Sequence, residues 1–125
     1  MAKKRNEPEL NRRIFNLFRR LNFDSSLLGY RYMKLAVMLC LEDENKIHNF
    51  HNLYKYIGVV YNIENSGSVE RCIRHLAQRT IETRENDGNE LMYDIFGDVI
   101  FTEKKITNKR FIAQIVEYMR MQADS

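Results

Sequence analysis

Six long hydrogen-bonding side chains fall on one face of the segment after residue 67, if that segment is helical. They are Glu70, Arg71, Arg74, His75, Gln78 and Arg79. An arginine guanidinium can donate to both O6 and N7 of guanine, and a glutamate can accept from N4 of cytosine. The same stripe is also typical of a solvated surface, where Glu70 and Arg74 form an i, i+4 ion pair, or of a face that binds a protein. The residue types therefore leave DNA, solvent and a protein partner as three interpretations.

The apolar residues of this segment supply the face that would hold such a helix in place. They recur at spacings of three and four, at Val69, Cys72, Ile73, Leu76, Ala77, Thr80 and Ile81. This spacing predicts an amphipathic helix over about residues 67–84, stopped by NDGN at 86–89. The polar turn NIENSG (62–67) separates it from another helical pattern over about 50–61. Two helices joined by a short turn, the second with a polar stripe, match a helix-turn-helix.

A helix-turn-helix places the N-terminal end of its second helix against base edges in the major groove. We therefore expect Glu70 and Arg71 to read bases. Phosphates are expected to be contacted further along this helix, at its start and from the preceding helix. The residues expected to contact the DNA backbone are Arg74, His75, Gln78, Arg79, Ser66 and Lys55.

The remaining pattern predicts an all-α bundle of about six helices that contains this motif. A first helix from Pro8 carries apolar residues at helical spacing as far as Leu21. A second helix over about 27–41 is apolar on most faces, which favours a central position. Asp24 or Ser25 is expected to cap this second helix.

The later connections are predicted from short stretches. LEDENK (41–46) predicts a charged connection, and a short helical turn over 91–96 is expected to end at Gly97. DVIFTEKKI (98–106) holds a β-branched and aromatic cluster, which favours an extended connection. Thr107 or Asn108 is expected to cap a last helix.

The composition is typical of one folded domain: 125 residues, 44% hydrophobic and 30% charged. Residues 1–20 hold seven basic and two acidic side chains, a bias that attracts polyanions. We expect residues 1–7 to form a mobile basic segment and residues 8–125 a single helical domain. The longest apolar run, residues 35–41, is too short to cross a membrane, and no apolar signal region follows the basic start. A cytoplasmic location is therefore expected.

Other reactive side chains form weaker patterns. Cys40 and Cys72 lie among apolar residues, where a thiol packs as a small hydrophobe. His48 and His51 are loosely spaced for a metal and lack an evident fourth ligand, so they are expected on the surface or at a helix cap. No phosphate-binding glycine loop or hydrolase motif is present in the sequence. We expect no catalytic residue, no metal and no cofactor.

Five stretches, in this order and spacing, resemble the C-terminal DNA-binding (effector) domain of the master sporulation response regulator of endospore-forming Firmicutes. They are LGYRYMKLAV (28–37), NLYKYI (52–57), SVERCIRH (68–75), LMYDIFG (91–97) and ITNKRFIAQIV (106–116). The resemblance covers about residues 15–122. It implies a six-helix fold that binds TGTCGAA-like promoter boxes as a homodimer or tandem pair, with the fourth helix in the major groove. It also implies contact with an RNA polymerase sigma subunit.

The resemblance assigns base contacts to the Ser-Arg-Val-Glu-Arg pattern of that family. Glu70 and Arg71 match its last two residues, but Ser68 stands at the base-facing position of the first arginine. The absence of one bidentate guanine contact removes about 1–3 kcal/mol of discrimination. Gly67 stands where the family has the serine of a capping box, which leaves Gly67 or Ser66 to cap the helix. The turn is also one residue longer, and no proline precedes Thr107.

Members of that family also carry an N-terminal receiver domain with a phosphoacceptor aspartate, and none fits ahead of Asn11. The native-looking start favours a natural single-domain relative over an excised piece. The first hypothesis is a sequence-specific DNA-binding transcription regulator. The alternative is a receiver-less interaction module that pairs with a full-length regulator or with a sigma subunit, and the missing arginine at Ser68 motivates it.

Overall fold

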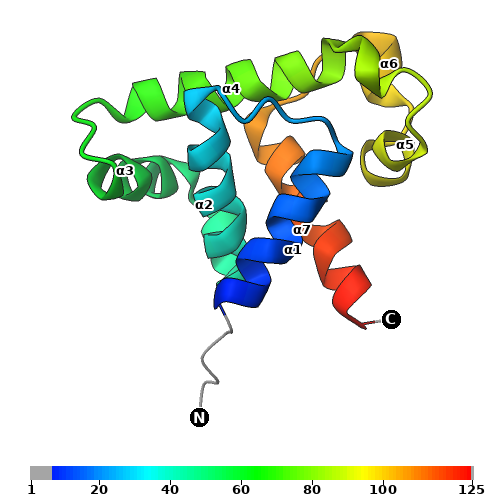
Figure 1. The fold of residues 1–125 in the computed structure, drawn as a ribbon. Coiled ribbons are helices and arrows are strands. Elements are labelled where there is room, and N and C mark those ends of the chain that lie inside the picture. The colour runs from blue at the N-terminus through cyan, green and yellow to red at the C-terminus, as the bar shows by residue number, and fades with distance from the viewer. Residues whose placement is uncertain (1–6, 125) are drawn as a thin grey trace.

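Helices form all the regular secondary structure of residues 7–124, the residues that this computed structural model describes (Figure 1). The α-helices are α1 (Glu7–Arg20), α2 (Leu28–Glu42), α3 (Phe50–Val60), α4 (Ser66–Glu82), α5 (Glu90–Phe96), α6 (Val99–Glu103) and α7 (Asn108–Asp124). Two 3-10 helices occupy Glu44–His48 and Arg84–Asn86. The predicted all-α class is confirmed. The predicted mobile basic segment lies outside the described residues except for Glu7, which begins α1.

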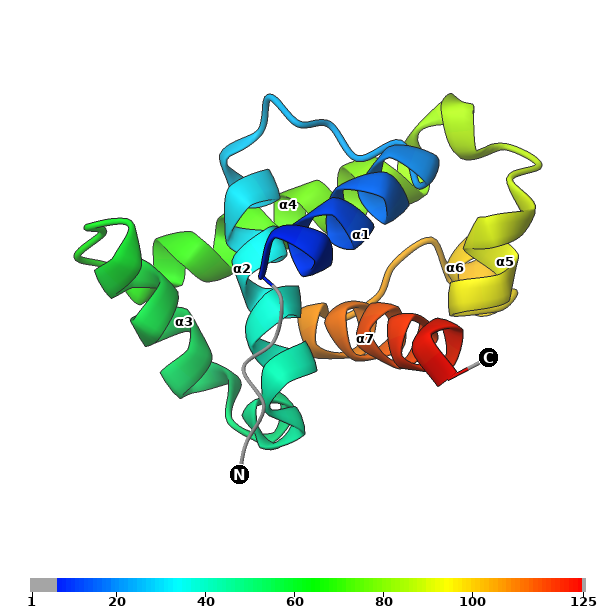
Figure 2. The same cartoon turned by 60° about the horizontal axis from the view of Figure 1, so that its bottom comes forward.

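The central position predicted for α2 is confirmed. This helix packs against α1, α3, α4 and α7, and Figure 2 shows it between α3 on one side and α1 and α7 on the other. Its buried residues are Gly29, Tyr32, Met33, Ala36, Val37 and Cys40. A helix that is apolar on most of its surface needs neighbours on several sides, and α2 has them. No helix within residues 7–124 combines the length and the apolar character needed to cross a bilayer.

A row of four phenylalanine rings joins the N-terminal and C-terminal parts of the bundle. Phe18 on α1 lies 4.3 Å from Phe23, measured between ring centroids. Phe23 lies 5.9 Å from Phe111 on α7, and Phe111 lies 4.7 Å from Phe96 at the end of α5. All four side chains are buried. Such ring pairs add about 0.5–1.5 kcal/mol each beyond the burial of their area, so the row ties α5 and α7 to the end of α1.

Segment 98–106 is not the extended connection that its sequence predicted. Its first residues form α6, which buries Ile100. This helix ends at Lys104, whose φ of 59° lies in the left-handed region. Apolar periodicity over so few residues does not distinguish a strand from a helical turn. The helical turn satisfies its backbone locally, whereas a single strand needs a neighbouring strand to pair with.

The predicted caps and connections had mixed outcomes. Neither Asp24 nor Ser25 caps α2, because α2 begins at Leu28, with Leu27 as an N-cap that makes no side-chain cap hydrogen bond. At α7 the Arg110 N–H donates to Thr107 Oγ1 at 3.2 Å, so Thr107 is the cap, one of the two residues predicted. The charged connection LEDENK runs into the 3-10 helix Glu44–His48, and α4 ends at Glu82, before NDGN.

Candidate nucleic-acid interface

The turn between α3 and α4 is built by residues 61–65. Asn62, with a φ of 58°, ends α3 in the left-handed region, and the Ile63 N–H donates back to the Gly58 carbonyl at 2.7 Å. Asn65 then caps α4, since its Oδ1 accepts from the Gly67 N–H at 2.8 Å. The expectation that Gly67 or Ser66 is the cap is therefore wrong, and α4 begins at Ser66, one residue earlier than predicted. The two helices and their turn form the predicted helix-turn-helix.

The apolar face of α4 anchors it to the bundle. Val69, Ile73, Leu76 and Ala77 are buried, as are Thr80 and Ile81 at the C-terminal end of the helix. The main neighbour of this face is α2, followed by α3 and α7. α2 and α4 meet closely at Gly29. A Cβ at this position would overlap the Cys72 carbonyl, so only glycine fits there. The backbone of α2 therefore fixes how deeply α4 sits, and hence how far its outer face projects.

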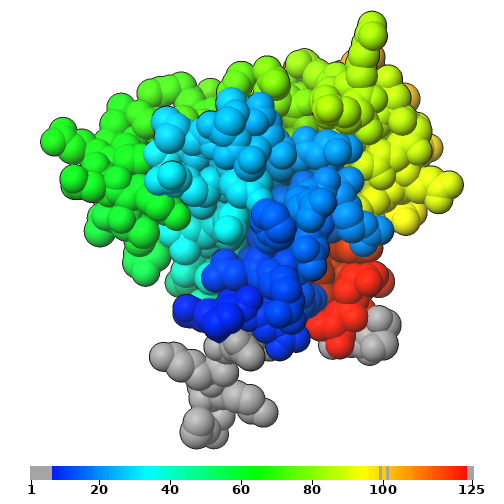
Figure 3. Space-filling view, viewed as in Figure 1, coloured from blue at the N-terminus to red at the C-terminus, as the bar shows by residue number. Residues whose placement is uncertain are grey.

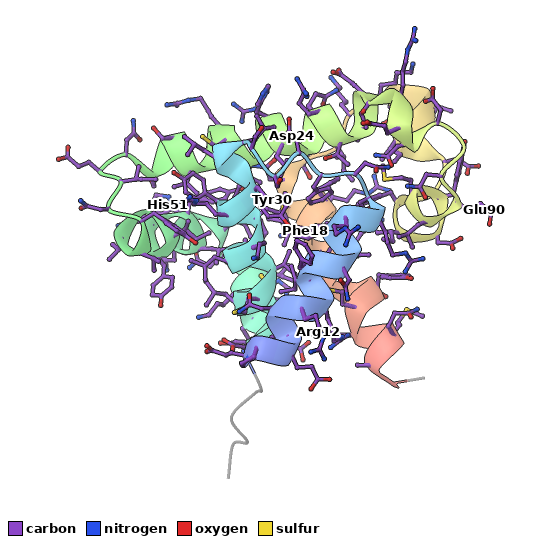
Figure 4. The ribbon with its side chains drawn as sticks, in the orientation of Figure 1. Arg12, Phe18, Asp24, Tyr30, His51 and Glu90 are labelled. Atoms are coloured by element: carbon purple, nitrogen blue, oxygen red, sulfur yellow. The ribbon has the colours of Figure 1, made fainter. Side chains whose placement is uncertain are left out.

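The N-terminal half of the polar stripe faces outward. Glu70, Arg71, Arg74 and His75 are all exposed. In the space-filling view, α4 follows the upper edge of the molecule, and the connection between α1 and α2 rises against its middle (Figure 3). Figure 4 shows nitrogen-tipped side chains projecting from α4 away from the bundle. The geometry is that of a helix with one side free to meet a large partner.

Two arginines of the stripe have acidic neighbours. Arg74 pairs with Glu70 at 3.6 Å, and both side chains are about half exposed. Arg79 pairs with Asp24, from the connection between α1 and α2, at 3.4 Å. Hydrogen bonds from Ser26 lower the pKa of Asp24, and the Arg79 guanidinium lowers it further, so the carboxylate stays charged. Exposed pairs of this kind contribute about 0–1 kcal/mol, so a phosphate can compete for either arginine.

The other predicted contact residues differ in how free they are. Ser68 is partly buried, and its Oγ accepts from Arg71 Nη2 at 3.3 Å. Gln78 is also partly buried, and its Nε2 donates to the Lys104 carbonyl at 2.9 Å and to Glu82 Oε2 at 2.8 Å. Gln78 is thus part of the support of α4. Lys55 is exposed on α3, and Ser66 is the partly buried first residue of α4.

Asn108, a residue that the sequence indicated only as a possible cap, connects three helices at the start of the stripe. Its Nδ2 donates to Tyr54 Oη on α3 and to the Glu70 carbonyl on α4, each at 3.1 Å. Burial raises the pKa of Tyr54, so its hydroxyl keeps its proton. This link sets the position of Glu70 relative to α3 and α7. A polar residue beside a helix start is common, so no local pattern pointed to this role.

The residues considered for a metal or for thiol chemistry do not form a site of their own. Burial raises the pKa of Cys40 to about 11, so its thiol stays protonated. His48 and His51 are exposed. Within residues 7–124, no three His, Cys, Asp or Glu side chains are placed to hold a metal ion together.

The comparison with protein families gives a match that covers most of the chain. The family model described as sporulation initiation factor Spo0A C terminal matches residues 14–119. That range includes the whole of α2 to α6, and therefore the helix-turn-helix and the polar stripe. A search of curated proteins found no match.

Proposed function

The chain belongs to the Spo0A C-terminal family and is a DNA-binding effector domain of a sporulation regulator; we propose that it reads promoter DNA by placing α4 in the major groove. In this proposal Glu70 and Arg71 contact base edges, together with Ser68. Phosphates are contacted by Arg74, His75, Arg79, Lys55 and Ser66. Gln78 was also expected to contact phosphate, but both of its amide hydrogens are donated to Glu82 and to the Lys104 carbonyl.

One observation carries this proposal: the start of α4 is anchored by its apolar face and uncovered on its polar face. Arg71 lies on the second turn of the helix, is exposed, and within the described residues its hydrogen bond is a weak contact of 3.3 Å with Ser68. A guanidinium in this position is free to form the two hydrogen bonds that guanine accepts in the major groove. The N–H groups at the start of α4 add a partial positive charge that favours a nearby phosphate.

Arg71→Ala is expected to reduce discrimination at one position of the bound sequence by about 1–3 kcal/mol. The side chain is exposed and supports little of the fold, so the variant should remain as stable as the wild type. The measurement is selection of bound duplexes from a random pool with both proteins. Arg12→Ala, in the N-terminal half of α1 and away from α4 (Figure 4), is the matched control and should select the wild-type sequence. Identical selection by Arg71→Ala and the wild type would remove the base-reading role.

Arg74→Ala is expected to weaken binding to all duplexes alike, because a phosphate contact carries no sequence information. The slope of log affinity against log salt should become shallower by about one unit. Titrations of one promoter duplex and one unrelated duplex at several salt concentrations measure both effects. Arg74→Lys keeps the charge and should keep the slope. A loss confined to the promoter duplex would instead assign Arg74 to base recognition.

A second candidate function is binding of a protein partner, and the exposed apolar residues of α3 favour it. Tyr56, Val59 and Val60 are 53%, 78% and 48% exposed. A second copy on DNA, a full-length sporulation regulator or a sigma subunit would each cover such a surface. The test is a pull-down with this domain as bait. If the domain retains a purified regulator or sigma subunit but retains no DNA, the result favours this candidate over the first.

A further inference from the structure

Four exposed basic side chains lie on the connection from α6 to α7 and on the first turn of α7. They are Lys104, Lys105, Lys109 and Arg110. Within the part of the chain that the structure describes, none of the four takes part in an ion pair. Residues 104–110 are called the basic arm below. Sequence patterns did not indicate it, because residues 104–106 belong to the expected connection and residues 107–110 to the expected start of the last helix.

Two hydrogen bonds hold the basic arm along the side of α4. Gln78 Nε2 donates to the Lys104 carbonyl at 2.9 Å, and Asn108 Nδ2 donates to the Glu70 carbonyl at 3.1 Å. Lys104 is bonded to Gln78 and Asn108 to Glu70, so the residue numbers rise along the arm as they fall along α4. The arm is therefore antiparallel to α4 over about two helical turns. Figures 1 and 2 both show it on the side of α4 opposite to the connection between α1 and α2.

The charges of α4 itself are partly neutralised, whereas those of the arm are not. Glu70 and Asp24 lie next to Arg74 and Arg79, at 3.6 and 3.4 Å. A helix in the major groove, which is about 12 Å wide, has a phosphate strand on each side. A segment that flanks the helix on one side therefore faces one of those strands. Its cations need no ion pair to break before they meet phosphate.

We propose that the basic arm binds the phosphates of one DNA strand beside the groove that α4 enters. Lys105 and Lys109 supply charge that is not shared with a carboxylate. They can therefore neutralise phosphates and release the counterions bound to the DNA, without first breaking an ion pair within the protein. The arm therefore adds to the salt-dependent affinity that Arg74 and Arg79 supply. This inference rests on the proposed function, since it concerns how the same domain holds the same DNA.

The test is a salt titration of the whole chain carrying Lys105→Gln and Lys109→Gln. The slope of log affinity against log salt should become shallower by about two units, one for each phosphate that the variant no longer neutralises. The affinity for all duplexes should fall alike, and the selected sequence should stay that of the wild type. Lys105→Arg with Lys109→Arg keeps both charges and should keep the wild-type slope, which separates charge from folding.

Arg12→Gln with Lys46→Gln is the control for net charge, because it removes the same charge from exposed sites on α1 and on the 3-10 helix after α2, where Lys46 lies 3.9 Å from Asp43. Its slope should equal that of the wild type. A wild-type slope in the Lys105→Gln, Lys109→Gln protein, or an equal change in the control, overturns the arm and leaves DNA binding by α4 intact. Absence of salt-dependent DNA binding in the wild type overturns the proposed function itself, and the arm with it.

Discussion

Asn86→Ala is expected to lower the free energy of unfolding by about 3–4 kcal/mol. The side chain is 1% exposed and makes four hydrogen bonds. Its Nδ2 donates to the carbonyls of Leu21 and Thr80 at 2.9 and 2.8 Å. Its Oδ1 accepts from Asn22 and Asn89 at 2.9 and 2.8 Å. Alanine leaves two carbonyls without these donors, and each unsatisfied buried group costs about 1–3 kcal/mol.

The four partners of Asn86 belong to three different parts of the fold. Leu21 and Asn22 directly follow α1, Thr80 lies in the last turns of α4, and Asn89 caps α5 through the Leu91 N–H. Asn86 is therefore the polar junction that fixes the C-terminal end of α4. Loss of this junction should therefore destabilise the whole bundle, because it connects the end of α1, α4 and α5.

Urea unfolding, followed by circular dichroism, measures the effect as a lower midpoint at an unchanged slope. Asn16→Ala is the matched control, because Asn16 is exposed on α1. The control should change the free energy of unfolding by less than about 0.5 kcal/mol. Equal stabilities for Asn86→Ala and Asn16→Ala would show that the buried junction contributes nothing.

The helices that carry the bundle were predictable because each buries one continuous face. In α4 the apolar residues keep one spacing from Val69 to Ile81, so the pattern fixed both the helix and the side that faces solvent. The predicted range of 67–84 differs from Ser66–Glu82 by two residues at most. What the pattern determines is the division between an inner and an outer face, and that division also selects the candidate site.

Features that depend on residues far apart in the chain were not predictable from spacing. Asp24 and Arg79 are 55 positions apart, and Lys104 and Gln78 are 26 positions apart, yet each pair makes a direct contact. Neither residue of a pair stands out locally. Asn86 is similar, since NDGN indicates a turn and not a buried amide. The choice of Asn65 over Gly67 as the cap depends on where the turn ends, which the sequence locates within a residue or two.

Gly29→Ala is expected to lower the free energy of unfolding by about 3 kcal/mol, through a forced displacement of α4. A Cβ at residue 29 would overlap the carbonyl oxygen of Cys72 and lie 2.8 Å from its carbonyl carbon. Both atoms belong to the backbone of α4, so no side-chain rotation relieves the overlap. The preference of helices for alanine over glycine, at most about 1 kcal/mol, opposes this cost without cancelling it.

Gly58→Ala provides a graded control, because the nearest atom to its added Cβ would be the Ile63 carbonyl oxygen at 3.0 Å. That neighbour lies in the turn before α4, where a shift of a few tenths of an ångström relieves the contact. The helix preference for alanine offsets most of the cost there, so a change below about 1 kcal/mol is expected. Urea unfolding of both variants tests the difference.

Gly29→Ala also tests whether the seating of α4 matters for function. The displaced helix carries Glu70, Arg71 and Arg74 outward or along its axis, so their side chains would no longer reach the bases and phosphates that we propose they contact. DNA affinity should therefore fall by more than the unfolded fraction explains, at a temperature where circular dichroism shows the variant folded. If Gly29→Ala binds DNA with wild-type affinity and is as stable as Gly58→Ala, the tight crossing of α2 and α4 is contradicted. If the folded Gly29→Ala protein binds DNA more weakly, the close approach of α2 to α4 that glycine permits is needed to position the polar face of α4.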